Sequence, residues 1–249
     1  MDIEANWQRI KAHRLRLSDQ EIRGLAEVLF FEQEAWLEEK LRQRDGEALA
    51  MEILGFLGGI GSLQAVSILL KQLDSGIEVL QVAAVEALKQ CPAIIILEPL
   101  SKIMLQQNRS AIKAGEVLLS FGENGAEELW NLWFDKKSVA GLKIQVLQLL
   151  AETTDVRAVH LAFLAFLSEE DELILTAMRA AEKRNASCLW GNVAGCLSHS
   201  AWRIRGRAVH LLGEWKESRA LAILQDMGSD PDQWVEEERQ KAIGILSHV

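Results

Sequence analysis

The chain has 249 residues, with 27 Lys or Arg against 36 Asp or Glu, so its formal net charge is −9. Hydrophobic residues make up 49% of it and charged residues 25%, a composition that excludes a disordered chain. The acidic balance argues against a general nucleic-acid binder, because such proteins neutralise phosphates with Lys and Arg.

The start of the chain and its cysteines predict a cytoplasmic protein. Residues 1–4 are acidic and lack the basic and apolar regions of a signal peptide. The longest apolar runs, such as 161–167, are far shorter than the about 20 residues that a membrane-spanning helix needs. Cys91, Cys188 and Cys196 are odd in number and lie in apolar contexts, which favours buried, reduced thiols.

An apolar helical segment recurs along the chain at intervals of 34, 30, 29, 34, 31 and 31 residues. Its anchor positions are Leu54, Leu88, Leu118, Leu147, Ala181, Leu212 and Ile243. A period near thirty holds two helices of about a dozen residues each and two turns. No segment shows sustained alternation with a period of two, so no strand is predicted.

This register predicts helices in pairs along the whole chain. Residues 3–14 and 18–30 form a cap over 1–31. The pairs that follow over 32–249 take 32–43 with 46–57, 63–73 with 78–90, 97–107 with 110–121, 125–134 with 138–151, 155–167 with 171–184, 187–197 with 201–214, and 217–227 with 231–247. A lone pair cannot bury both apolar faces, so neighbours must stack. We therefore predict a single array over 1–249 without a domain boundary.

Prolines, a capping aspartate and glycines mark the predicted helix ends. Pro99 is expected to open a helix, and Asp230–Pro231 to place a capping side chain before a proline in the first helical turn. Gly122, Gly125 and Gly228 stand where helices are expected to stop.

Two stretches carry the repeat most clearly. One runs from Leu54–Gly58 through 63–66 to 82–88, and the other is Arg203–Trp215. With them the chain resembles HEAT-type helical repeats over roughly 32–247. The resemblance implies an all-α, right-handed superhelix of about seven pairs with the second helices on the concave side. Of the family's Asp–Arg ladder only the Arg position at Ile204–Arg205 is kept, so stacking is expected to rest mainly on apolar packing.

The position two residues before each anchor falls outside the apolar stripe and is expected on the concave side. These residues change from acidic to basic along the chain: Glu52, Glu86, Glu116, Gln145, Arg179, His210 and Lys241. Trp202 and Arg207 join the basic end, and Trp202 and Trp234, at helix starts, are expected to be partly exposed. This row predicts a contact surface for another protein or peptide, in particular an acidic one at the C-terminal end. Solvated helix faces and core aromatics are the ordinary alternative.

No catalytic group, metal site or cofactor is predicted, and the leading function is a non-catalytic protein-binding scaffold or adaptor. Iron-dependent hydroxylases among HEAT proteins carry adjacent His-Glu pairs, and no histidine here is followed by Glu. The resemblance leaves two alternatives. One is a bilin-lyase-type protein acting on a chromophore or small ligand, suggested by helices such as Ala84–Leu88. The other is DNA-lesion binding of the alkylpurine-glycosylase type, which the C-terminal Arg and Trp residues suggest and the net charge opposes.

Overall fold

The computed structural model describes residues 47–74 and 77–248, apart from the side chains of residues 47–50, 52, 53 and 64. Every regular element in this part of the chain is a helix, which confirms the predicted all-α class. The predicted cap at 1–31 and the predicted helix at 32–43 lie outside the described residues.

The chain divides into two compact units, and the boundary between Gly125 and Ala126 falls inside helix α9. Each unit is a stack of helical pairs, which confirms helical repeats of the predicted HEAT-like kind. A single superhelix over the whole chain, and its right hand, stay predictions.

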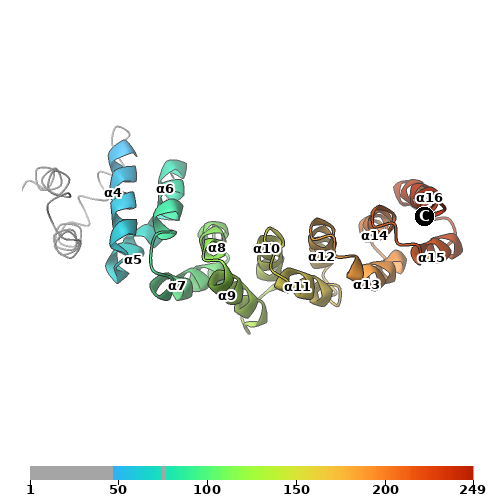
Figure 1. Cartoon of the computed structure of the whole chain (residues 1–249), viewed down its shortest axis with the longest axis horizontal. Helices are drawn as coiled ribbons and strands as arrows, with labels where there is room; N and C mark the ends of the chain where they lie inside the picture. Colours follow the sequence, from blue (N-terminus) through green and yellow to red (C-terminus); the bar gives the residue numbers. More distant parts are fainter. Residues whose placement is uncertain (1–46, 75–76, 249) are drawn as a thin grey trace, which may run out of the picture. The chain divides into compact units, whose positions relative to one another are not determined.

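The N-terminal unit places its helices in two layers. The elements are α4 (Glu47–Ile60), α5 (Leu63–Gln72), α6 (Glu78–Leu88), α7 (Ala93–Gln106), α8 (Ser110–Ser120) and the start of α9 (Glu123–Phe134). Helix α6 packs between α4 and α8 in one layer, while α5 packs beside α7 in the other (Figure 1). The second helices of successive repeats therefore lie side by side.

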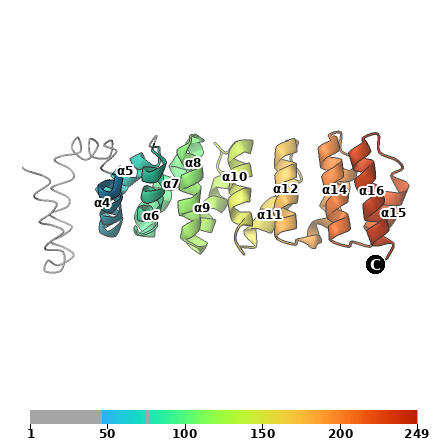
Figure 2. The same ribbon diagram turned by 90° about the horizontal axis from the view of Figure 1, so that it is seen from above.

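The C-terminal unit continues the same alternation. After α9 come α10 (Ala140–Ala151), α11 (Arg157–Ala165), α12 (Asp171–Lys183), the turn η2 (Ser187–Leu189), α13 (Trp190–Gly195), the turn η3 (Cys196–Ser198), α14 (Trp202–Glu214), α15 (Ala220–Asp226) and α16 (Gln233–Leu246). Helices α10, α12, α14 and α16 stand side by side in one layer (Figure 2). Helices α11, α13 and α15 pack behind them.

The anchor positions confirm the repeat register. Six of them are buried: Leu54, Leu88, Leu118, Leu147, Ala181 and Leu212. The seventh, Ile243, is half-buried and packs against the core of the C-terminal unit. Because each anchor comes from the second helix of its pair, one apolar seam runs between the layers of each unit.

Among the predicted helix ends, those at Pro99 and Gly125 are wrong, and those at Gly122 and Gly228 are confirmed. Helix α7 begins at Ala93, after Pro92, and carries Pro99 in its interior, where the missing proline N–H leaves one helical hydrogen bond unmade. Gly125 lies inside α9, and a Cβ there would lie 1.7 Å from the Leu118 carbonyl oxygen, so this glycine serves close packing. Gly122 and Gly228 follow α8 and α15 with φ of 59° and 69°, as helix-ending glycines do.

The three thiols have different environments. Cys91 and Cys196 are buried as predicted, and burial raises the pKa of each to about 11. The prediction for Cys188 is wrong, because the short turn η2 buries Leu189 and leaves Cys188 exposed. Among the described residues, no helix combines the length and apolar character that crossing a membrane requires.

Candidate functional site

Helices α12, α14 and α16 of the C-terminal unit enclose a groove of about 800 Å³. Its lining comes from all three helices and the α16 cap: Leu175, Arg179, Trp202, Arg203, Arg207, Asp232, Gln233, Trp234 and Glu237. The groove therefore brings together Arg179, Trp202 and Arg207, which the sequence predicted for the basic end of a contact surface. Their role in binding stays a prediction.

Two tryptophans contribute large apolar surfaces to the groove lining. The rings of Trp202 and Trp234 meet edge to face, with centroids 5.8 Å apart and an interplanar angle of 76°. The two residues are 44% and 43% exposed, which confirms the predicted partial exposure. Because covering half-exposed rings removes apolar surface from water and so lowers the free energy, this pair suits contact with an apolar group of a ligand.

Trp234 keeps its position by packing on the backbone of α14. A Cβ placed on Gly206 would lie 1.9 Å from Cζ3 of Trp234, so the indole ring fills the space that a side chain would need. Glycine at this position therefore allows the start of α16 to approach α14 closely.

Guanidinium groups line the α12 and α14 side of the groove. Arg207 forms an ion pair with Glu182, which lies 25 residues earlier. Arg203 lies over the Trp202 ring, with its Cζ 5.6 Å from the centroid. Arg179 is exposed, and in the part of the chain that the structure describes neither Arg179 nor Arg203 has an ion-pair partner.

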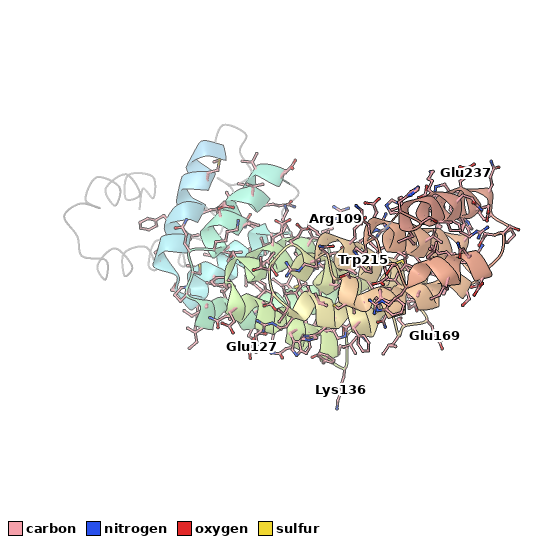
Figure 3. All side chains as sticks on the ribbon, turned by 45° about the vertical axis from the view of Figure 1, so that its right-hand side comes forward. Arg109, Glu127, Lys136, Glu169, Trp215 and Glu237 are labelled. Carbon is pink, nitrogen blue, oxygen red and sulfur yellow. The ribbon has the colours of Figure 1, made fainter. Side chains whose placement is uncertain are left out.

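Two carboxylates lie on the α16 side. Asp232 caps α16 by accepting hydrogen bonds from the backbone N–H groups of Trp234 and Val235 at 3.1 and 3.2 Å. Glu237, labelled in Figure 3, accepts a hydrogen bond from Nε2 of Gln233 at 3.0 Å. The Asp232 charge is therefore directed at the positive end of the helix dipole.

The predicted cap at Asp230 is wrong because α16 begins at Gln233 and has Asp232 as its cap. Asp230 lies in the turn before the helix, where it accepts a hydrogen bond from the Asp232 N–H at 2.9 Å and pairs with Arg205. Arg205 donates from Nε and Nη2 to the two carboxylate oxygens of Asp230 at 2.7 and 2.8 Å. Its Nη1 donates to the carbonyl oxygens of His199 and Ser200 at 2.9 and 2.8 Å. The Arg205 side chain is 13% exposed and that of Asp230 3%. The guanidinium holds the pKa of Asp230 below its usual range.

The arginine of this pair, Arg205, stands at the one arginine position of the repeat pattern that was recognised in the sequence. It joins the start of α14 to the turn before α16, and the turn is held further by the Asp230 N–H, which donates to Glu236 at 3.0 Å. Arg239 donates to the same Glu236 at 2.9 Å and to the Leu224 carbonyl oxygen at 2.7 Å. Arg239 above all lowers the pKa of Glu236 to about 2. The α16 wall of the groove is therefore fixed by paired charges.

Two further residues of the predicted row share one carboxylate. Nδ1 of His210 lies 3.1 Å from Oε2 of Glu238, and Nζ of Lys241 donates to Oε1 at 2.6 Å. Lys241 first, and His210 with it, lower the pKa of Glu238. His210 lies on α14 and Lys241 on α16, and neither lines the groove.

The acidic part of the predicted row lies on other helices. Glu86 on α6 and Glu116 on α8 are exposed, and each pairs with a lysine three residues away along the chain, at 2.6 and 3.5 Å. Gln145 on α10 is half-buried, and its amide nitrogen has no hydrogen-bond partner among the described residues. The Glu52 side chain lies outside the described residues. The groove thus contains only part of the predicted row.

The sequence reasoning missed Leu175, Asp232, Gln233 and Glu237 as lining residues, and it placed Arg203 only in the basic C-terminal part of the chain. The repeat period contains a signal for the lining residues near the tryptophans. Trp202 and Trp234 are separated by 234 − 202 = 32 residues, close to one period, so the starts of α14 and α16 are equivalent positions of neighbouring repeats. Arg203, next to Trp202, and Gln233, next to Trp234, accordingly line the same groove.

A second hollow, of about 550 Å³, contains Asp171, Cys196 and His199. Nδ1 of His199 accepts a hydrogen bond from the Ala201 N–H at 3.1 Å, and Nε2 lies 3.8 Å from Asp171. The raised pKa of Cys196 keeps its thiol protonated at neutral pH, which does not suit a nucleophile. The described residues contain no group of three His, Cys, Asp or Glu side chains that could hold a metal ion.

No family model and no curated protein matches the chain. Among solved structures, human deoxyhypusine hydroxylase in complex with glycerol is 14% identical with a TM-score of 0.43, over 100% of this chain and 92% of that one. An engineered protein of the Northeast Structural Genomics Consortium is 17% identical with a TM-score of 0.45, over 90% and 71%. A designed armadillo repeat protein is 14% identical with a TM-score of 0.38, over 85% and 98%. Likeness at this level carries no conclusion about what the groove binds.

Proposed function

We propose that this chain is a non-catalytic, cytoplasmic scaffold or adaptor that binds another protein through the groove over α12, α14 and α16. One observation carries the proposal: a half-exposed, edge-to-face Trp202–Trp234 pair in the lining of a groove that is also lined by arginines. Tryptophan and arginine dominate the binding energy of protein interfaces when they lie at the centre of a contact.

The walls of the groove are held in place before any partner arrives, which supports this proposal. Asp232 caps α16, the Arg205–Asp230 pair joins α14 to the preceding turn, and Gly206 seats the Trp234 ring. A surface that is already ordered loses less conformational entropy on binding. A preformed groove of this kind is therefore suited to a defined partner segment.

Photo-crosslinking from inside the groove tests the proposal. A benzoylphenylalanine in place of Gln233 projects from the groove lining, and the same residue in place of Gln225, exposed on α15, is the matched control. In cells that contain the natural partner, we expect position 233 and not position 225 to crosslink to one defined protein. Trp202→Ala in the same chain is expected to abolish that product.

Three results contradict the proposal. A product at 233 that Trp202→Ala leaves unchanged places the contact elsewhere. A crosslinked nucleic acid supports the DNA-lesion alternative, because the arginines then contact phosphates. Transfer of a bilin to an acceptor protein supports the lyase alternative.

A further inference from the structure

We infer that the segment bound in this groove carries carboxylate side chains beside a large apolar side chain, with the carboxylates on the α12–α14 side. The inference rests on the proposed protein-binding function and goes on to name the chemistry of the partner. It follows from which charges of the groove are already engaged within the chain.

The carboxylates near the groove have internal partners. Asp232 accepts two backbone N–H groups at the start of α16. Glu182 pairs with Arg207. Glu237 accepts a hydrogen bond from Gln233 at 3.0 Å but has no ion-pair partner in the described residues. Of the two carboxylates that line the groove, Asp232 caps a helix and Glu237 does not. The negative charge of Glu237 therefore remains uncompensated and faces a ligand.

Two guanidinium groups are left for a ligand. Arg179 is exposed on α12, and Arg203 is exposed at the second position of α14. The Cζ of Arg203 lies over the Trp202 ring, 5.6 Å from the centroid. Its N–H groups point outward in the plane of the guanidinium, so they remain able to donate to a carboxylate. An arginine held over an aromatic ring is already ordered and loses less entropy when it binds.

The apolar part of the ligand is defined by the two indoles. The Trp202–Trp234 pair is half-exposed and lies directly beside the Arg203 guanidinium. A ligand side chain that covers both rings also excludes water from the neighbouring arginine–carboxylate contact, which strengthens that contact. An aromatic or branched residue next to an acidic one satisfies both features together.

The opposite wall sets the direction of the charge. Glu237 on α16 repels a carboxylate that approaches from its side, so an acidic segment is directed toward α12 and α14. A nucleic-acid backbone fits this groove less well, because it needs many cations along a line, and here two free arginines face an acidic wall in a chain of net charge −9.

Selection of random displayed peptides on the full chain tests the inference. We expect the selected peptides to be acidic and to carry an aromatic or branched residue. The Arg179→Glu/Arg203→Glu variant is expected to lose at least about tenfold in affinity for them. The matched control is Lys136→Glu/Lys137→Glu, which makes the same change of charge on exposed residues of the α9–α10 connection. Glu237→Gln is expected to tighten binding by removing the repulsion.

The outcomes separate this inference from the proposed function. Neutral or basic peptides that bind the wild-type chain but not Trp202→Ala overturn the acidic ligand and leave the protein-binding groove standing. Selection that gives the same peptides on Trp202→Ala as on the wild type overturns both. Duplex DNA that binds at physiological salt and is lost on reversal of the two arginines assigns these cations to phosphates and also overturns the inference. Circular dichroism confirms that each variant is folded.

Discussion

The helices of residues 47–125 and those of residues 126–248 stack on their neighbours through different contacts. In the N-terminal unit, α4 and α6 meet at a glycine, and a Cβ on Gly58 would lie 2.4 Å from the Ala87 carbonyl oxygen. The Cys91 thiol lies 3.7 Å from the Gly58 carbonyl oxygen at the same contact. Ion pairs such as Lys89–Glu86 lie within one helix.

In the C-terminal unit, charged side chains also join successive repeats. Arg205 reaches Asp230 and Arg207 reaches Glu182, each across 25 residues, and Arg184 donates to the Thr153 carbonyl oxygen across 31. These separations are close to the repeat period. The comparison teaches that close apolar and backbone packing stacks the described helices of the first unit, whereas in the second unit charged side chains also join successive repeats.

The largest effect is expected from breaking the pair between α14 and α16. Arg205→Met leaves the Asp230 carboxylate, 3% exposed, without its cation. We expect the free energy of unfolding to fall by about 3 kcal/mol, as for other buried pairs that lose one partner. Urea denaturation followed by circular dichroism measures it. A loss no larger than that of an exposed pair shows that the charged contacts do not hold this unit together.

A second comparison sets Gly58→Ala against Gly206→Ala. The first places a methyl group against backbone, which cannot move without shifting α6, and the second against the Trp234 ring, which can rotate. Both are expected to lose about 1–3 kcal/mol, with the larger loss at Gly58. Only Gly206→Ala is expected to change tryptophan emission.

Matched controls are available for both glycines. Gly59 in α4 and Gly244 in α16 have no atom within 4 Å of an added Cβ. Alanine at either is expected to stabilise its helix by up to about 1 kcal/mol. If Gly59→Ala destabilises the chain as much as Gly58→Ala, the close approach of α4 and α6 is not the cause.

Acid should weaken the C-terminal unit through two carboxylates. Asp230 has a pKa below its ordinary 3.8, and that of Glu236 is lowered from 4.5 to about 2. A lowered pKa stabilises the fold above the ordinary value, and the contribution is lost as pH falls through the folded-state value. We expect stability to fall between about pH 4.5 and about pH 2, and to fall less in Arg205→Met, where Asp230 has lost its cation. Urea midpoints across this range measure it, and parallel curves for the two proteins contradict it.

The smallest effect is expected for the ion pairs within single helices of the N-terminal unit. Lys89→Met removes the partner of Glu86 at the exposed surface of α6. The free energy of unfolding is expected to change by less than about 0.5 kcal/mol. A loss near that of Arg205→Met removes the distinction between the two units.

The local apolar pattern and the repeat period predicted the helices well. An anchor such as Leu118 is buried between the two layers of its own unit, so its burial does not depend on the details of the next repeat. The period also predicted Arg179 and Arg207 for one surface, and the predicted helix start added Trp202, which lines the same groove. The cap at Asp230 was wrong because the helix begins two residues later than predicted, with Asp232 as its cap. The pairing of Asp230 with Arg205 is a contact across 25 residues that no local rule contains. Which charges remain free, as at Arg203, likewise depends on contacts between helices and is visible only in the folded chain.

The affinity of the crosslinked partner for two alanine variants tests the binding groove most directly. Trp202 lies in the groove and Phe163 lies on α11, and both are 44% exposed, so they expose similar fractions to solvent on different surfaces. Calorimetry with the purified partner is expected to show that Trp202→Ala weakens binding by about 2 kcal/mol, roughly 30-fold, while Phe163→Ala leaves it unchanged. Equal effects, or a loss at Phe163 alone, contradict a contact through the α12–α14–α16 groove.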